Sequence, residues 1–191
     1  FWNKLKLRGG SRGKGGEERL AYLKGGFVVI AQTLARRISE LGGRVVVNSP
    51  VSRLTRRDGQ WIASTPDGEV ASGKVLATTA LPLTARMIEG WASKEYVASL
   101  DRIQYIGNVC LVLELDRPLS KTYWLNVNDL NFPFVGVIEH TNFERAATYG
   151  GRHIVYLSKY LPHTEPLYAM SADETLDFAF PYLKQMFPQF E

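Results

Sequence analysis

The apolar positions of the chain first follow a helical spacing and then an alternating one. Between residues 27 and 41 they recur every three or four residues, which places them on one face of a helix, and Gly42-Gly43 is suited to end it. β-Branched residues then predict a strand over 45–55, bent at Ser49-Pro50. The apolar helix positions are Phe27, Ile30, Leu34, Ile38 and Leu41.

Two turn signals divide the next stretch into a small antiparallel meander. Asp58-Gly59 is a tight hairpin signal, and Pro66-Asp67-Gly68 marks a second turn. Strands are expected on either side, over 61–65 and 69–72. Residues 74–79 then predict a buried strand, and Pro82 suits the first turn of a following helix.

The second half of the chain predicts a sheet with covering helices. Residues 103–115 alternate, with Val109, Leu111, Leu113 and Leu115 on one face, and 123–127, 134–139 and 153–160 are further candidate strands. Residues 171–174 form a capping box, and helical spacing continues to residue 187. The pattern as a whole indicates an α+β layer arrangement.

Composition places the chain among globular proteins. Its 191 residues are 45% hydrophobic, and no apolar run reaches the ~18 residues of a membrane helix. The single cysteine, Cys110, cannot form an internal disulfide, which fits a reducing compartment, so we expect a cytoplasmic protein. Because the sequence starts with Phe1 and stops just after an apolar helix, we expect a fragment of a longer protein.

Basic residues gather at the amino-terminal end. Residues 1–24 hold 7 of the 23 Lys and Arg and 2 of the 19 Asp and Glu. The segment RGGSRGKGG is not a phosphate-binding loop, because Gly15 stands where a hydroxyl is needed, and Glu18 breaks the G-x-G-x-x-G dinucleotide motif. We expect a solvated loop without specific nucleic-acid binding, and peripheral contact with an anionic membrane stays an open alternative.

No catalytic or metal site can be identified from residue spacing. His140, His153 and His163 stand far apart with no nearby Cys or His partner, so no metal site is predicted. No nucleophile motif and no paired carboxylates appear either, so the catalytic residues are unknown.

An ordered set of short motifs over residues 22–82 resembles the flavin-dependent amine oxidase superfamily, which includes protoporphyrinogen oxidases and phytoene desaturases. The set comprises a Gly-Gly pair before a helix, a G-x-x-V strand, a "PV..I"-like strand, a meander with D-G turns, and a "VxAT"-like strand running into a proline. In this sequence these are Gly25-Gly26, Gly43-Arg44-Val45-Val46, Pro50 to Leu54, Asp58-Gly59 with Asp67-Gly68, and Val75 to Thr78 with Pro82.

The resemblance implies a fold and a reaction. Residues 26–81 would be part of an FAD-binding domain, and residues 1–25 and 82–191 a substrate-binding domain. The longer protein would oxidise an organic substrate by hydride transfer to the flavin. The family's N-terminal glycine motif and C-terminal flavin-contacting segment are absent, so we expect the isolated chain to be inactive and not to retain FAD.

The resemblance also implies which residues contact FAD. The Val51 backbone would bind the adenine, and Ala77, Thr78 and Thr79 would run beside the adenosine. Gly25-Gly26 would bring the backbone close to cofactor or substrate. From the residues alone there are other interpretations: Gly25-Gly26 can be a turn before the helix, and Val51 can be a core strand residue.

Candidate substrate-binding residues follow the predicted strands. His140 and Asn142 belong to the polar group Glu139-His140-Thr141-Asn142, which is alternatively a satisfied turn. Aromatic side chains are candidates for an apolar pocket or for core packing. They are Tyr123, Trp124, Phe132 and Phe134.

The expected partner is thus an apolar or aromatic small molecule, and the oligomeric state cannot be predicted. The alternative function is a non-catalytic binding domain whose basic N-terminal segment contacts nucleic acid or an anionic membrane.

Overall fold

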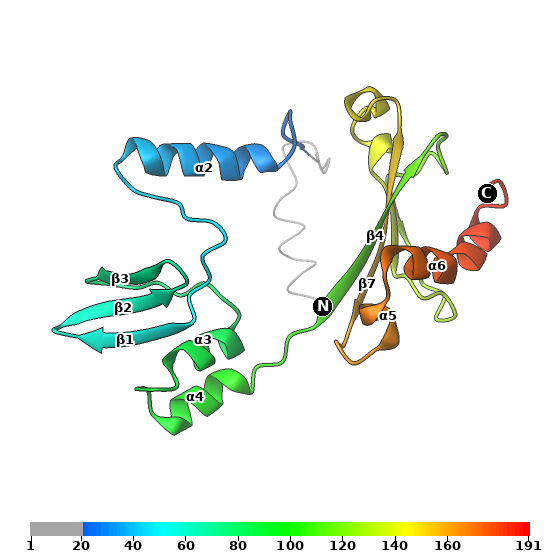
Figure 1. Cartoon of the computed structure of the whole chain (residues 1–191). Helices are drawn as coiled ribbons and strands as arrows, with labels where there is room; N and C mark the ends of the chain where they lie inside the picture. The colour runs from blue at the N-terminus through cyan, green and yellow to red at the C-terminus, as the bar shows by residue number, and fades with distance from the viewer. Residues whose placement is uncertain (1–20) are drawn as a thin grey trace, which may run out of the picture. The chain divides into compact units, whose positions relative to one another are not determined.

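The computed structural model describes residues 21–191 (Figure 1). The described residues divide into two compact units. One unit ends at Val51 and includes Thr65–Gly68, and the other comprises Ser52–Ser64 and Glu69–Glu191. The strands form two separate sheets among helices, so the predicted mixed α+β class is confirmed. The assignment of 26–81 and 82–191 to a cofactor domain and a substrate domain stays a prediction.

Helix α2 (Val28–Glu40) forms where the apolar spacing predicts it. It begins after Gly25 and Gly26, whose φ angles of 92° and 83° are left-handed and make the turn into the helix. None of its residues is buried, and the five apolar positions over 27–41 are 41–72% exposed. The predicted apolar face therefore exists but is not covered by the described residues.

A three-stranded sheet follows, in the order β1 (Arg53–Arg57), β2 (Gln60–Thr65) and β3 (Gly68–Ser72). The β1–β2 hairpin turns at Asp58 and Gly59, which both have positive φ (51° and 79°), as this tight turn requires. The predicted meander is confirmed.

One predicted strand is wrong and another is right only at its end. The strand predicted over 45–55 is present only from Arg53, as the start of β1, and residues 45–51 join no sheet. The strand predicted over 74–79 is absent, since these residues are likewise unpaired within the described part of the chain. The second segment is also exposed and not buried, with Leu76 at 88%. β-Branched side chains favour extended backbone, but a strand also needs a hydrogen-bonded neighbour, and no described segment supplies one.

Helices α3 (Leu81–Ile88) and α4 (Lys94–Asp101) come next. Pro82 lies in the first turn of α3 as predicted, and the Ser93 hydroxyl caps α4 by accepting from the Tyr96 backbone N–H. A small core forms between α3 and β1, and the Trp91 indole donates to the Leu54 carbonyl at 2.7 Å. This core consists of Leu54, Met87 and Ile88.

The second sheet contains the remaining four strands. They are ordered β4-β7-β6-β5 with every neighbouring pair antiparallel, and their bounds are β4 Gly107–Leu115, β5 Trp124–Asn126, β6 Gly136–Glu139 and β7 His153–Leu161. All four predicted strands are confirmed. β4 begins at Gly107 and not at residue 103, because its partner β7 ends at Leu161, opposite Gly107.

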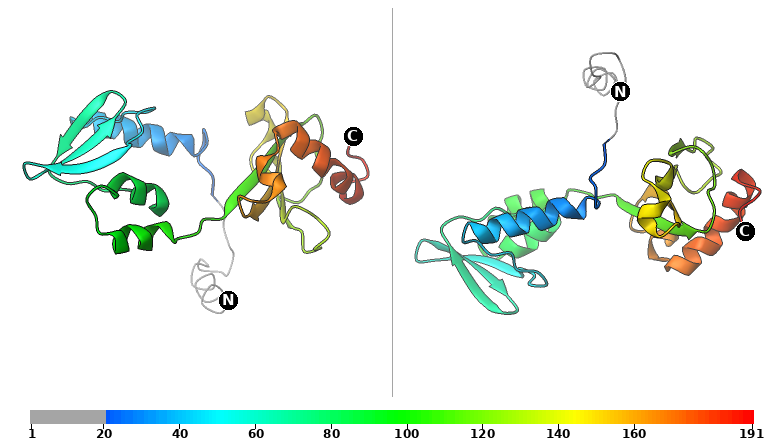
Figure 2. Two further views of the ribbon diagram at one scale, coloured as in Figure 1. Left: turned by 60° about the horizontal axis from the view of Figure 1, so that its bottom comes forward. Right: turned by 90° about the horizontal axis from the view of Figure 1, so that it is seen from above.

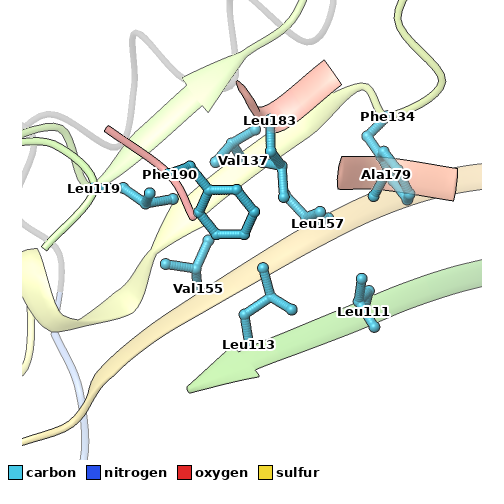
Figure 3. Close-up of a cluster of buried hydrophobic side chains, with 10 residues drawn as sticks. All are labelled: Leu111, Leu113, Leu119, Phe134, Val137, Val155, Leu157, Ala179, Leu183 and Phe190. Carbon is cyan, nitrogen blue, oxygen red and sulfur yellow. The ribbon is translucent and has the colours of Figure 1, made fainter. Parts of the chain in front are cut away.

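Helix α6 (Ala172–Met186) lies along this sheet in each view, preceded by the short α5 (Pro166–Ala169) (Figure 2). The predicted capping box is present: Ser171 Oγ accepts from the Glu174 N–H, and Glu174 accepts from the Ser171 N–H. Leu111 and Leu113 of β4, Val155 and Leu157 of β7, and Ala179 and Leu183 of α6 form most of the main core (Figure 3).

Within residues 21–191, no helix has both the length and the apolar character needed to cross a bilayer. Most of the basic segment, and with it the prediction of a solvated loop, lies outside the described residues.

Candidate functional site

The two faces of the β4–β7 sheet differ because successive strand residues point to opposite sides. The face toward α6 carries the main core. The strand register places the opposite set of side chains together on the other face, which α6 does not cover. This open face comprises Asn108, Cys110, Val112, Glu114, Trp124, Asn126, Gly136, Ile138, Ile154, Tyr156, Ser158 and Tyr160.

One end of the open face is covered by two short 3-10 helices, η1 (His140–Asn142) and η2 (Ala146–Tyr149). Thr141 Oγ1 accepts from the Ile154 N–H, and the His140 and Tyr156 rings are 5.8 Å apart. The other end has no such cover among the described residues and contains a hollow of about 460 Å³. This volume is within the range of small-molecule pockets.

The hollow is lined by side chains of β5, β6 and β7. The open-face residues around it are Trp124, Asn126, Gly136, Ile138, Ser158 and Tyr160. Trp124 and Tyr160 are 54% and 69% exposed, so both offer aromatic surface beside the hollow. The combination of exposed aromatic surface and a few polar groups in a concavity is typical of ligand sites.

Asn126 fixes the orientation of Trp124. The indole N–H donates to Asn126 Oδ1 at 2.9 Å. Since an indole N–H only donates, the side-chain atom facing it must be the amide oxygen, and the amide NH₂ is the other end of Asn126.

Asn108 of β4 makes a hydrogen bond to Ser158 of the adjacent strand β7. Its amide nitrogen donates to Ser158 Oγ at 3.1 Å and to the Lys159 carbonyl at 3.2 Å. Because Ser158 Oγ accepts here, its own hydroxyl hydrogen is left to donate elsewhere.

The loop that leads into β5 is held by a buried carboxylate. Glu139 is 1% exposed, and it accepts hydrogen bonds from Leu119 N at 3.0 Å, Ser120 N at 2.7 Å and Ser120 Oγ at 3.0 Å. Charge-assisted bonds of this kind are the stronger ones in proteins. Glu139 therefore positions the start of β5, and with it Trp124.

Asn142, a predicted substrate-binding residue, supports the same loop. Its amide nitrogen donates to the carbonyls of Ser120 and Thr122, both at 3.1 Å. Asn142 does not line the hollow. Its contacts match the alternative interpretation of this polar group as a satisfied turn, and its role toward a substrate stays a prediction.

His140 is buried and paired. Its Nε2 lies 2.7 Å from the Tyr149 hydroxyl, and burial lowers the pKa of the imidazole although Glu144 opposes the shift. Burial thus disfavours the charged imidazolium form. It too lies outside the hollow, beneath η2.

The four predicted aromatic residues lie in different places, and they do not form one pocket. Trp124 lines the hollow, whereas Phe134 is 5% exposed and belongs to the main core. Tyr123 lies between them in exposure, and its ring centroid is 5.0 Å from that of Phe143. Phe132 packs against Tyr182 of α6. Of the four, the structure brings only Trp124 to the hollow.

The predicted FAD-contacting residues lie in the two exposed segments outside both sheets. Val51 is 38% exposed and lies two residues before β1, and Ala77, Thr78 and Thr79 are exposed. Thr79 Oγ1 lies 2.8 Å from Thr84 Oγ1 at the start of α3. The contact of these residues with FAD, and of Gly25-Gly26 with cofactor or substrate, stays a prediction.

No sequence pattern pointed to a functional role for Asn108, Asn126, Gly136, Ser158 or Tyr160. The alternation within 153–160 indicates only a shared strand face, since Tyr156, Ser158 and Tyr160 alternate with Val155 and Leu157. No cluster of three potential metal-ligating residues occurs among the described side chains.

The comparisons with known proteins agree on one fold. The model of the family described as "Flavin containing amine oxidoreductase" matches residues 4–191. An oxidoreductase from Methanosarcina mazei is 22% identical over 87% of this chain and 40% of its own, with a TM-score of 0.69. Among curated proteins, none matches significantly.

Two further solved structures have similar folds. A provisionally named protoporphyrinogen oxidase from Exiguobacterium sp. 255-15 is 14% identical over 84% of this chain and 36% of its own, with a TM-score of 0.67. A triple mutant of putrescine oxidase is 14% identical over 84% and 35%, with a TM-score of 0.65. The chain thus spans two fifths or less of each of these three structures.

Proposed function

Because the chain belongs to the flavin-containing amine oxidoreductase family, we propose that it forms the substrate-binding part, and a smaller cofactor-binding part, of an FAD-dependent oxidoreductase. The observation that carries the proposal is the match of the family model over residues 4–191. The substrate is an organic small molecule, and the flavin, when bound, supplies the redox chemistry by taking up a hydride.

The open face of the β4–β7 sheet is the substrate side of this proposal. It offers a hollow of suitable volume, flanked by two exposed aromatic rings. Glu139 and Asn142 hold the loop before β5, and Asn126 fixes the Trp124 indole. In this proposal Trp124, Asn126 and Tyr160 contact the substrate, and Glu139 and Asn142 position the loop before β5. No acid or base of the chain is assigned to the reaction.

The cofactor side of the proposal rests on two exposed segments, each assigned by the family resemblance: Val51 in one unit, and residues 77–79 in the other. The exposed apolar face of α2 supports the same proposal, because apolar area of this size in a folded enzyme is normally covered.

The test is to purify the natural full-length protein, record its visible flavin spectrum, and follow bleaching of the flavin under anaerobic conditions with candidate substrates. Val51→Asp should reduce the flavin-to-protein ratio, because a carboxylate would be placed against the adenosine. Val70→Asp, on the exposed surface of β3, is the matched control. A full-length protein that binds no flavin even after reconstitution would contradict the proposal.

A further inference from the structure

The lining of the hollow indicates the charge of its ligand. None of its nine lining residues carries a formal charge. Lys159, the nearest basic residue in β7, belongs to the opposite set of the strand and pairs with Glu165 at 3.3 Å. A charged group in this hollow would lose hydration without gaining a counter-charge, so a neutral ligand is favoured.

The polar groups of the hollow indicate whether the ligand donates or accepts hydrogen bonds there. Asn126 uses its oxygen for the Trp124 indole, and Ser158 Oγ accepts from Asn108. The Asn126 NH₂ and the Ser158 hydroxyl hydrogen, on the two strands that flank β6, can each donate to a ligand. A ligand oxygen placed between them would accept from both.

Gly136 provides the space between these two donors. It pairs with Asn126 on β5 and with Ser158 on β7, so its missing side chain leaves a gap in the middle of the open face. A Cβ built on Gly136 would have no closer neighbour than the Leu125 carbonyl oxygen at 4.0 Å, and its φ is not in the left-handed region. A side chain at this position would enter the hollow without backbone strain.

We propose that the hollow binds a neutral aromatic or conjugated carbonyl compound, with its oxygen over Gly136 between Asn126 and Ser158 and its ring against Trp124 and Tyr160. That the hollow is the substrate site rests on the proposed function, and the inference adds the chemical class of the substrate. Gly136 is then the residue that determines how large a ring is admitted.

The test uses the 191-residue chain and four probes that share one ring system: naphthyl methyl ketone, ethylnaphthalene, naphthoate and naphthylmethylammonium. Binding is measured by saturation-transfer NMR and by quenching of tryptophan fluorescence. The ketone should bind at least about tenfold more tightly than each of the other three, which lack the acceptor or carry a charge.

Two variants separate this site from non-specific binding. Gly136→Leu should weaken ketone binding by about tenfold or more, whereas the exposed Gly73→Leu, with no atom within 4 Å of its Cβ, should not change it. Asn126→Asp keeps an acceptor for the Trp124 indole but removes the amide donors and adds a negative charge. It should therefore weaken binding of the ketone and strengthen binding of the ammonium probe. Equal binding of all four probes, or unchanged selectivity in Asn126→Asp, would overturn the inference.

The result is independent of the test of the proposed function, because no flavin takes part. A full-length protein without flavin but with selective ketone binding would overturn the proposed oxidoreductase and keep the ligand class. Flavin-dependent turnover of a charged substrate bound at this hollow would overturn the ligand class and keep the oxidoreductase.

Discussion

Replacing Glu139 by Gln tests whether the buried carboxylate holds the loop before β5. The carboxylate accepts three hydrogen bonds, two of them from the backbone N–H groups of Leu119 and Ser120. The amide has one acceptor oxygen, so at least one N–H would face an NH₂ group and remain unsatisfied in a site that is 1% exposed.

The cost follows from these contacts. Losing a hydrogen bond to a charged acceptor costs about 1.5–3 kcal/mol, and a buried donor left without a partner costs about 1–3 kcal/mol. Because the two contributions overlap, we expect the free energy of unfolding to fall by roughly 2–4 kcal/mol. With a urea dependence of about 2 kcal/mol per M, the unfolding midpoint should drop by about 1–2 M at unchanged slope.

The assay is urea unfolding followed by circular dichroism, with Glu114→Gln as the control. Glu114 lies on β4 of the same sheet but is exposed, so its substitution should change the free energy of unfolding by less than about 0.5 kcal/mol. If Glu139→Gln lies within about 0.5 kcal/mol of Glu114→Gln, the carboxylate does not hold the loop and the reasoning fails.

Three further outcomes are expected from the same unfolding assay. Leu157→Ala in the main core, 1% exposed, should cost about 2–5 kcal/mol, whereas the fully exposed Leu130→Ala should cost almost nothing; equal effects would place the core elsewhere. Ser171→Ala should cost about 1 kcal/mol through loss of the α6 cap, and no loss would mean that the capping box does not form. Burial lowers the pKa of His140 in the folded protein, so the protein should lose stability as pH falls below about 6.5, the pKa of the unfolded chain. His140→Gln should reduce this loss, whereas His153→Gln should not. If His140→Gln leaves the pH dependence of stability unchanged, His140 is not the group responsible.

The elements that could be predicted from the sequence are those determined by nearby residues. Asp58-Gly59 forms its hairpin because both residues adopt positive φ, and Ser171 with Glu174 forms its cap within one turn of helix. Strand β4 was predictable because the alternation of its apolar residues matches burial on one side.

The predicted strand segments that remain unpaired show the limit of such reasoning. Val45 to Val47 and the segment 74–79 have the composition of strands, yet pairing depends on a neighbour that composition does not reveal. Like these two segments, α2 has an apolar pattern that the described residues leave exposed. The hydrophobic pattern of these three segments is satisfied only by contacts that the described residues do not provide, as expected if they work within the larger flavoprotein proposed above.

The candidate site was harder to predict than the fold because its defining residue has no side chain. Polar clusters such as Glu139 to Asn142 are conspicuous in a sequence, but here their contacts position a loop. Gly136 is inconspicuous, and only the register that sets it between Asn126 and Ser158 shows that its small size opens the sheet face. A strand glycine with open space above it leaves room for a ligand between the two neighbouring strands, and a large side chain there would occupy part of the hollow. The site therefore depends on a missing side chain as much as on the groups around it.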